Sequence, residues 1–205
     1  MAVSTFNPGT GEGRTPNDGA GSDSFATVRG AASASTAVDD VLVALTSVNG
    51  STFRIHRVFL PFDTSALPDN ATVSAANLQV YRSDAVATFA NADTTTLHVV
   101  TQTQASDTSL VQDDFDQVSF TSKGSINFAD TSDGAYSVIT ITDMAIISLT
   151  GFTKLALLTG RDQGNSQPTG SNVLGMQSRG DANPPVLTVT FSAPGFEETS
   201  YSFFL

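Results

Sequence analysis

The stretch that decides the fold is RVFLPFDTSALPDNATVSAANLQVY, residues 57–81. It holds two apolar-rich runs with a proline-containing turn between them. In the first run every second residue from 58 to 62 is apolar, so these side chains share one face of a strand. Ile55 and Phe59 lie on the opposite face. Apolar residues on both faces indicate a strand that is covered on both sides over part of its length.

The turn between the two runs has its own sequence pattern. The Asp63 carboxylate is expected to accept backbone N–H bonds from the residues that follow it, as in an Asx-type turn. Pro68, followed by Asp and Asn, fixes the reversal. The second run then alternates Leu78 and Val80 with polar or aromatic neighbours. We predict a scaffold corner with four structural turn residues: Phe62, Asp63, Leu67 and Pro68.

Similar short runs recur along the rest of the chain. Each is rich in β-branched or aromatic residues and is bounded by Gly, Pro, Asn or Asp, which is typical of strands separated by turns. They cover residues 25–30, 41–47, 94–103, 135–142, 153–160, 172–179 and 185–191. Helical patterns are confined to residues 107–118 and 142–151. The sequence therefore predicts an all-β, antiparallel jelly-roll β-sandwich with one or two short helices.

The two ends of the chain differ in composition from residues 25–191. Residues 1–24 are mostly Gly, Asn, Thr, Ser and Asp, so we expect a flexible N-terminal arm before a sandwich domain over residues 25–191. Residues 192–205 form an aromatic tail. Disordered segments contain few aromatic residues, so we expect this tail to pack against something. The tail either folds back on its own sandwich or docks on a neighbouring subunit. Its candidate docking residues are Phe196, Tyr201, Phe203, Phe204 and Leu205.

Composition narrows the function classes. The chain has 205 residues, no cysteine and a net charge of −11. No disulfide or thiolate site can form, and an acidic chain is not expected to bind nucleic acid or an anionic membrane surface. The first residues lack the pattern of a secretory signal peptide. We therefore expect synthesis in a cytoplasm without export through a signal.

Catalytic groups are scarce. The two histidines, His56 and His98, lie inside predicted strands, and no G-x-S-x-G motif accompanies them. We predict no enzyme activity, no catalytic residue and no bound cofactor. Clustered aspartates are the weak candidates for a structural Ca²⁺ site, because carboxylates are its usual ligands. They are Asp39, Asp40, Asp113, Asp114 and Asp116.

Residues 57–81 resemble the disaggregatase-related, or DNRLRE, family. Its pattern is a strand ending in Phe-Asp, a Ser-x-Leu-Pro turn and a strand with spaced Ala, Leu and Tyr, here Ala76, Leu78 and Tyr81. Residues 183–191, NPPVLTVTF, resemble the last strand of the family. The resemblance implies a jelly-roll sandwich of extracellular or cell-surface proteins, some of which bind polysaccharide. It brings no catalytic residue to this chain.

The glycine-rich start and the stretch FDTSALPDNATVSAA also look like structural proteins of tailed bacteriophages. We therefore expect a non-enzymatic structural protein on a virion surface, such as a head decoration, fibre or tail-associated protein. Its expected partners are capsid or other virion proteins, other copies of itself in a homo-oligomer, and host surface polysaccharide. The alternatives are an extracellular carbohydrate-binding module and a subunit of an extracellular filament.

Overall fold

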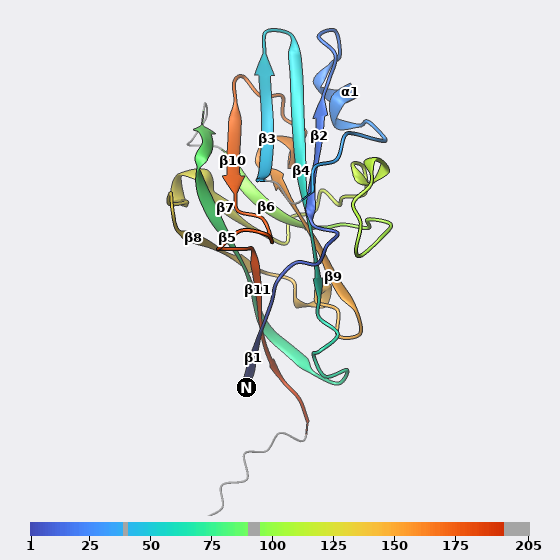
Figure 1. Ribbon diagram of the computed structural model, residues 1–205, viewed down its shortest axis with the longest axis vertical. Helices are drawn as coiled ribbons and strands as arrows, with labels where there is room; N and C mark the ends of the chain where they lie inside the picture. The colour runs from blue at the N-terminus through green and yellow to red at the C-terminus, as the bar shows by residue number, and fades with distance from the viewer. Residues whose placement is uncertain (39–40, 90–94, 195–205) are drawn as a thin grey trace, which may run out of the picture.

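The computed structural model describes residues 1–38, 41–89 and 95–194, and for residues 84–89 it describes the backbone alone. In this part of the chain, strands dominate and all their pairings are antiparallel (Figure 1). The two α-helices, α1 and α2, are one turn or little more. The predicted all-β antiparallel sandwich with one or two short helices is confirmed.

The strands follow one another along the chain with short helices between them. The strands are β1 (Ala2–Phe6), β2 (Gly13–Asp18), β3 (Leu42–Asn49), β4 (Thr52–Asp63), β5 (Thr72–Phe89), β6 (Thr96–Thr101), β7 (Gly124–Asn127), β8 (Tyr136–Ile141), β9 (Phe152–Thr159), β10 (Asn172–Met176) and β11 (Val186–Ser192). The helices are α1 (Phe25–Arg29), α2 (Gly160–Gln163) and the 3-10 helices η2 (Gln112–Asp114), η3 (Phe128–Asp130) and η4 (Met144–Ile146).

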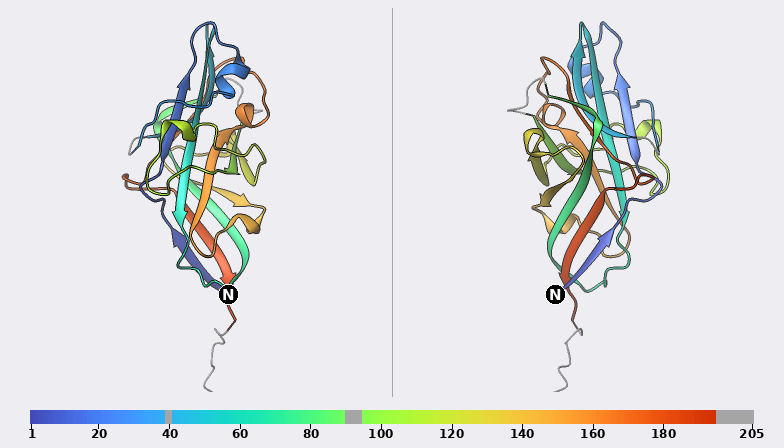
Figure 2. Two further views of the ribbon diagram at one scale, coloured as in Figure 1. Left: turned by 90° about the vertical axis from the view of Figure 1, so that its right-hand side faces the viewer. Right: turned by 60° about the vertical axis from the view of Figure 1, so that its left-hand side comes forward.

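The long strand β5 belongs to both layers of the sandwich. Residues 72–81 pair with β11 and β8, whereas the later part pairs with β10. Sheet A therefore has the order β1-β11-β5-β8. Sheet B has the order β10-β3-β4-β9-β6-β7, with β2 paired to β4. Figure 2 shows how the strands of the two sheets enclose the interior.

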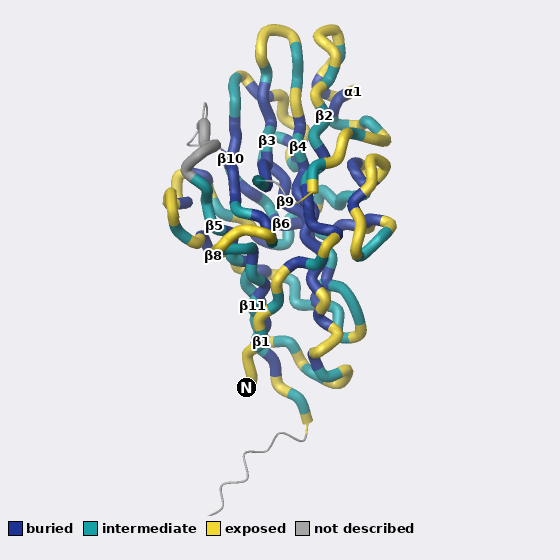
Figure 3. The backbone as a smooth tube through the Cα atoms, viewed as in Figure 1, coloured by how far each residue is buried: buried dark blue, intermediate teal, exposed yellow. Residues whose placement is uncertain are grey.

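The main hydrophobic core lies between the two sheets (Figure 3). Alternate residues of each strand point into it, because successive side chains of a strand face opposite ways. Sheet B contributes Leu42, Leu60 and Leu157, and sheet A contributes Leu78, Ile139 and Val189, all of them buried. The first run of the predicted corner supplies Val58, Leu60 and Phe62 to this core, as its alternation predicts.

Sheet B is covered on its outer side as well. Phe25 and Val28 of α1 pack there with Ile55 and Phe115, and this second cluster is also buried. Ala31, Ala34 and Phe53 pack against this cluster. The two-sided apolar pattern of residues 52–62 therefore reflects a strand with a core on each face.

The N-terminal segment corrects the expected flexible arm. Residues of β1 pair with β11, and those of β2 pair with β4, so both strands belong to the sandwich. The segment has few apolar side chains, but strand pairing uses the backbone, which every residue carries. Gly11 also allows close packing, because a Cβ there would lie 2.6 Å from the carbonyl oxygen of Asp107. The missing side chain is what lets the chain lie against that loop.

The helices also differ from the predictions. Residues 25–29 form α1, where a strand was predicted, because the Ser24 side chain accepts a hydrogen bond from the Thr27 backbone N–H and caps the helix. The pattern over 142–151 yields only η4, capped by Asp143. The pattern over 107–118 yields only η2, with Leu110 and Phe115 buried nearby. None of the helices in the described residues has the length and apolar character needed to cross a bilayer.

Candidate functional site

The corner of residues 62–71 has the geometry that the sequence predicts. The Asp63 Oδ1 atom accepts bonds from the Ser65 backbone N–H at 3.1 Å and from the Ser65 hydroxyl at 2.6 Å. These bonds lower the pKa of Asp63. Phe62 and Leu67 are buried, and the carbonyl of Pro68 accepts the Ala71 N–H at 2.9 Å. The corner therefore serves as a scaffold.

Arg57 is a fully buried charged residue on the same side of β4 as Ile55. Its guanidinium donates to both carboxylate oxygens of Asp162, at 2.7 Å from Nε and 2.9 Å from Nη2. Nη1 also donates to the carbonyl of Phe115 at 2.7 Å, and Nη2 to the carbonyl of Arg29 at 2.9 Å. Such bidentate, charge-assisted bonds fix geometry strongly.

This cluster fastens the outer cover to sheet B. Arg29 ends α1 and donates through Nε to the backbone carbonyl of Asp162 in α2 at 2.7 Å. The guanidinium of Arg29 lies 3.8 Å from the ring centre of Phe120, and that of Arg57 lies 4.1 Å from the ring centre of Phe115. The pair of Arg57 and Asp162 is closed to solvent, so its role is structural.

Sequence reasoning did not single out this pair. Arg57 and Asp162 are 105 residues apart, and no local spacing links them. One feature pointed toward Arg57: it is an arginine within a strand that is apolar on both faces. A charged group placed there needs a buried partner.

The two histidines do not form a catalytic arrangement. His98 bonds to the hydroxyls of Thr96 at 2.6 Å and Ser122 at 2.9 Å, and burial lowers its pKa. His56 bonds to Asp18 at 3.1 Å, and burial also lowers its pKa although Asp18 opposes the shift. Each histidine thus serves as a hydrogen-bonded strand residue.

The three described aspartate candidates for Ca²⁺, residues 113, 114 and 116, do not converge on a common site. Asp114 is buried, and its two carboxylate oxygens accept backbone N–H bonds from Ala105 at 2.9 Å and Val111 at 2.8 Å. Asp116 accepts a bond from Gln117, and Asp113 is exposed. Residues 39 and 40, the remaining candidates, lie outside the described residues. Within those residues no group of three His, Cys, Asp or Glu side chains is placed to hold a metal ion.

The outer side of sheet A is a surface that sequence analysis did not single out. In β1, β8, β11 and residues 72–81 of β5, whose side chains the structure describes, no outward-facing side chain is charged. We call this surface the neutral face. It consists of Val3, Thr5, Ala75, Asn77, Gln79, Tyr81, Tyr136, Val138, Thr140, Val186, Thr188 and Thr190.

Strand register brings these residues together. Gln79 lies between Val138 on β8 and Val186 on β11, and the next row, two residues along, has Asn77 at its centre. Figure 2 shows β5, β11 and β1 side by side in its right-hand view. The face is accessible, because Val138 is 51% exposed and Val3 is 63% exposed.

Two ion pairs adjoin the strands of this face. Arg82 and Asp133 form an ion pair before β8, and Lys123 binds Asp143 at 2.7 Å after β8. Each pair is electrically compensated. A neutral centre with charged residues at its rim is the arrangement found at protein interfaces.

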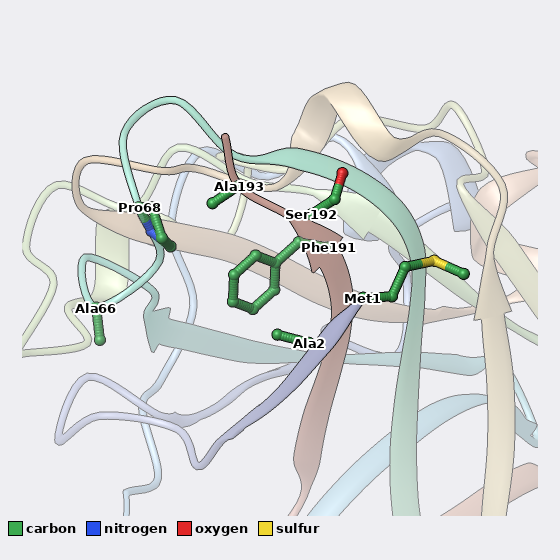
Figure 4. A pocket seen from close by; sticks show the side chains of 7 residues that line it. All are labelled: Met1, Ala2, Ala66, Pro68, Phe191, Ser192 and Ala193. Carbon is green, nitrogen blue, oxygen red and sulfur yellow. The ribbon is translucent and has the colours of Figure 1, made fainter. Parts of the chain in front are cut away.

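A pocket opens at the end of the sandwich where β1 begins and β11 ends (Figure 4). Its volume is about 410 Å³. One wall comes from the corner of residues 62–71, and the ring of Phe191 lies inside. The lining residues are Met1, Ala2, Ala66, Pro68, Phe191, Ser192 and Ala193. The docking candidates Phe196, Tyr201, Phe203, Phe204 and Leu205 lie outside the described residues.

Comparison with family models and with curated proteins identified no relative. No protein-family model matches the chain, and no curated protein matches it. The likeness of residues 57–81 to the DNRLRE family therefore stays a prediction. The surfaces themselves, namely the neutral face and the apolar pocket, are suited to binding by shape and desolvation.

Proposed function

We propose that this chain is a non-enzymatic structural protein that packs against neighbouring subunits on the surface of a particle, namely a virion. The neutral face is the observation that supports this proposal. The chain carries a net charge of −11, so two copies, or one copy and another acidic protein, repel each other over most surfaces. The neutral face allows contact without placing like charges together.

The composition of the face fits packing. The buried centres of protein interfaces are depleted of charge and enriched in tyrosine, and this face carries Tyr81 and Tyr136 with β-branched residues around them. The tyrosine rings contact each other edge to face, with centres 5.3 Å apart. The particle assignment itself draws on the resemblance of residues 57–81 to phage structural proteins.

The proposal is tested by placing a charge on the face. Val138→Asp should weaken self-association at least tenfold. Association would bury the new carboxylate in the interface and bring it close to the same carboxylate of the second copy. Val38→Asp is the matched control: Val38 is 47% exposed, against 51% for Val138, and it lies beside β2 rather than on sheet A. Sedimentation velocity over a concentration series measures the association.

The particle assignment needs a separate measurement. Virions purified from lysates of the source should contain peptides of this chain in stoichiometric amounts by mass spectrometry. If purified virions contain no peptides of this chain, the virion assignment is wrong. A chain that stays monomeric at all concentrations, and binds no purified virion protein, would reject the packing role.

A second candidate is binding of an uncharged polysaccharide by the same face. Asn77, Gln79 and the surrounding threonines offer amide and hydroxyl groups without charge, and two tyrosines lie beside them. Such groups suit a neutral polyhydroxy ligand better than a charged one. Calorimetry with neutral and anionic polysaccharides tests this, with Asn77→Ala expected to abolish any heat of binding. A flat response to the neutral polymers would remove the candidate.

A further inference from the structure

We propose that β1 pairs with β1 of a second copy of this chain, antiparallel and about a twofold axis, so that the two A sheets form one continuous sheet. This contact uses the edge of sheet A rather than its outer side. It therefore goes beyond packing on the neutral face and does not rest on it. It is supported by the open edge of β1, by the absence of charge along that edge, and by the symmetry of antiparallel pairing.

Among the described residues, only one side of β1 has a paired strand. β1 pairs with β11 over its whole length, from Ala2 opposite Phe191 to Phe6 opposite Leu187. The right-hand view of Figure 2 shows β1 at the margin of the sheet, beside β11. In an antiparallel pair, the backbone groups of alternate residues point away from the partner strand. These groups of β1 are therefore placed to bond to a further strand.

Two other edge strands, β8 and β2, are protected against such pairing. Next to the end of β8, the Thr142 backbone N–H donates to the carbonyl of Lys123 at 2.8 Å, and β7 follows directly along the chain. β2 contains charged residues and a proline, which are the usual means of preventing strand addition at an edge. They are Arg14, Pro16 and Asp18.

The sequence of β1 contains neither charge nor proline. It reads AVSTF, and residues 2–11 include no charged residue. Valine, threonine and phenylalanine also favour the extended conformation of a strand. Two copies of a chain with a net charge of −11 repel each other over most surfaces. The uncharged edge of β1 lets the backbones of two copies approach without that repulsion.

Antiparallel pairing makes β1 complementary to itself. With Ser4 of the two copies opposite each other, Val3 of each copy lies opposite Thr5 of the second copy, as a twofold interface requires. Val3 and Thr5 are both exposed on the outer side of the sheet, and cross-strand pairs of this kind stabilise a sheet. The two Met1 ammonium groups would lie at opposite ends of the paired strands, about 20 Å apart. A second copy therefore fits this edge on both sides of the axis.

The test places charges at the two positions that pairing brings together. Val3→Lys with Thr5→Lys would put lysine opposite lysine twice in each dimer, so the dissociation constant should rise about tenfold. Val3→Lys with Thr5→Glu is the matched control, because it replaces the same two side chains but puts lysine opposite glutamate. Its dissociation constant should stay within about threefold of the parent value. Mixing the double-lysine variant with Val3→Glu, Thr5→Glu should restore association as a heterodimer.

Sedimentation velocity over a concentration series measures this association in the Val138→Asp background. Val138 lies on β8, at the opposite edge of sheet A from β1, so its substitution weakens packing on the neutral face and leaves the β1 edge unchanged. Dimers should remain in this background, and larger assemblies should not.

The outcomes separate the two contacts. Equal weakening by the double-lysine and the lysine–glutamate variants, or no weakening by either, would overturn edge pairing. Complete loss of association on Val138→Asp alone would also overturn it, while supporting contact through the neutral face. Dimers that survive Val138→Asp and respond to the lysine pair would support edge pairing. If Val138→Asp then has no effect on association, the neutral-face contact is wrong and the edge contact still holds.

Discussion

Removal of the Asp162 carboxylate gives the sharpest test of what holds the outer cover on sheet B. In the Asp162→Ala variant the Arg57 guanidinium would lose both bonds of its bidentate pair, at 2.7 and 2.9 Å. The side chains of both residues are 1% exposed, so water cannot replace the lost partner without opening the structure. Arg29 would lose the same carboxylate, which lies 3.3 Å from its Nε.

The expected cost is about 3–5 kcal/mol, which is typical when one partner of a buried ion pair is removed. A domain is commonly stable by only about 5–15 kcal/mol, so the variant should be marginal. The remaining bonds of Arg57 to the carbonyls of Phe115 and Arg29 place the value toward the lower part of this range.

Equilibrium urea denaturation followed by circular dichroism measures this cost. Asp107→Ala is the matched control, because its ion pair with Lys154 is partly exposed and its loss should change the unfolding midpoint only slightly. An Asp162→Ala midpoint within error of the control would refute the reasoning. It would mean that Arg57 finds water or another partner in the folded protein.

Three further predictions concern strand packing and protonation. Gly124→Ala should destabilise the fold by several kcal/mol and lower the melting temperature, because the added Cβ would collide with the carbonyl oxygen of Thr140; an unchanged melting temperature would contradict this. Ser65→Ala should raise the pKa of Asp63 toward its ordinary value in a carbon-13 NMR titration, since two hydrogen bonds from Ser65 lower it; no rise would show that the hydroxyl contributes nothing. Burial lowers the pKa of His98 in the folded protein below its value in the unfolded chain. As the pH falls below about 6.5, the unfolded state therefore binds more protons than the folded state, and the free energy of unfolding decreases. His98→Gln should flatten this loss in denaturation curves from pH 7 to 5, and an unchanged slope would contradict the assignment.

The sequence predicted the parts of this fold that depend on neighbouring residues. Alternation of side chains over residues 58–62 and 76–81 follows from the geometry of a strand, so the buried positions could be identified without the structure. The turn at Asp63 and Pro68 could be identified for the same reason, since Asx-type bonds and a fixed proline φ act within a few residues.

Two other local predictions were wrong, because the residues concerned are compatible with more than one structure. The run of residues 25–30 is rich in residues that suit a strand, but Ser24 at a helix start and Gly30 at its end are capping residues as well. Residues 1–24 looked too polar to order. Their strands form through backbone hydrogen bonds, and amino-acid composition does not reveal these because every residue has the same backbone groups.

The sequence by itself determined an acidic, cysteine-free chain of short alternating strands, together with the corner that joins two of them. Only the tertiary structure decided that Arg57 meets Asp162, that the outer side of sheet A is free of charge, and that β1, β11 and the corner leave a pocket open to the core. The physical reason is distance along the chain. Pairing between strands brings together residues separated by a hundred positions or more, and the register of that pairing, rather than any local pattern, decides which side chains share a surface.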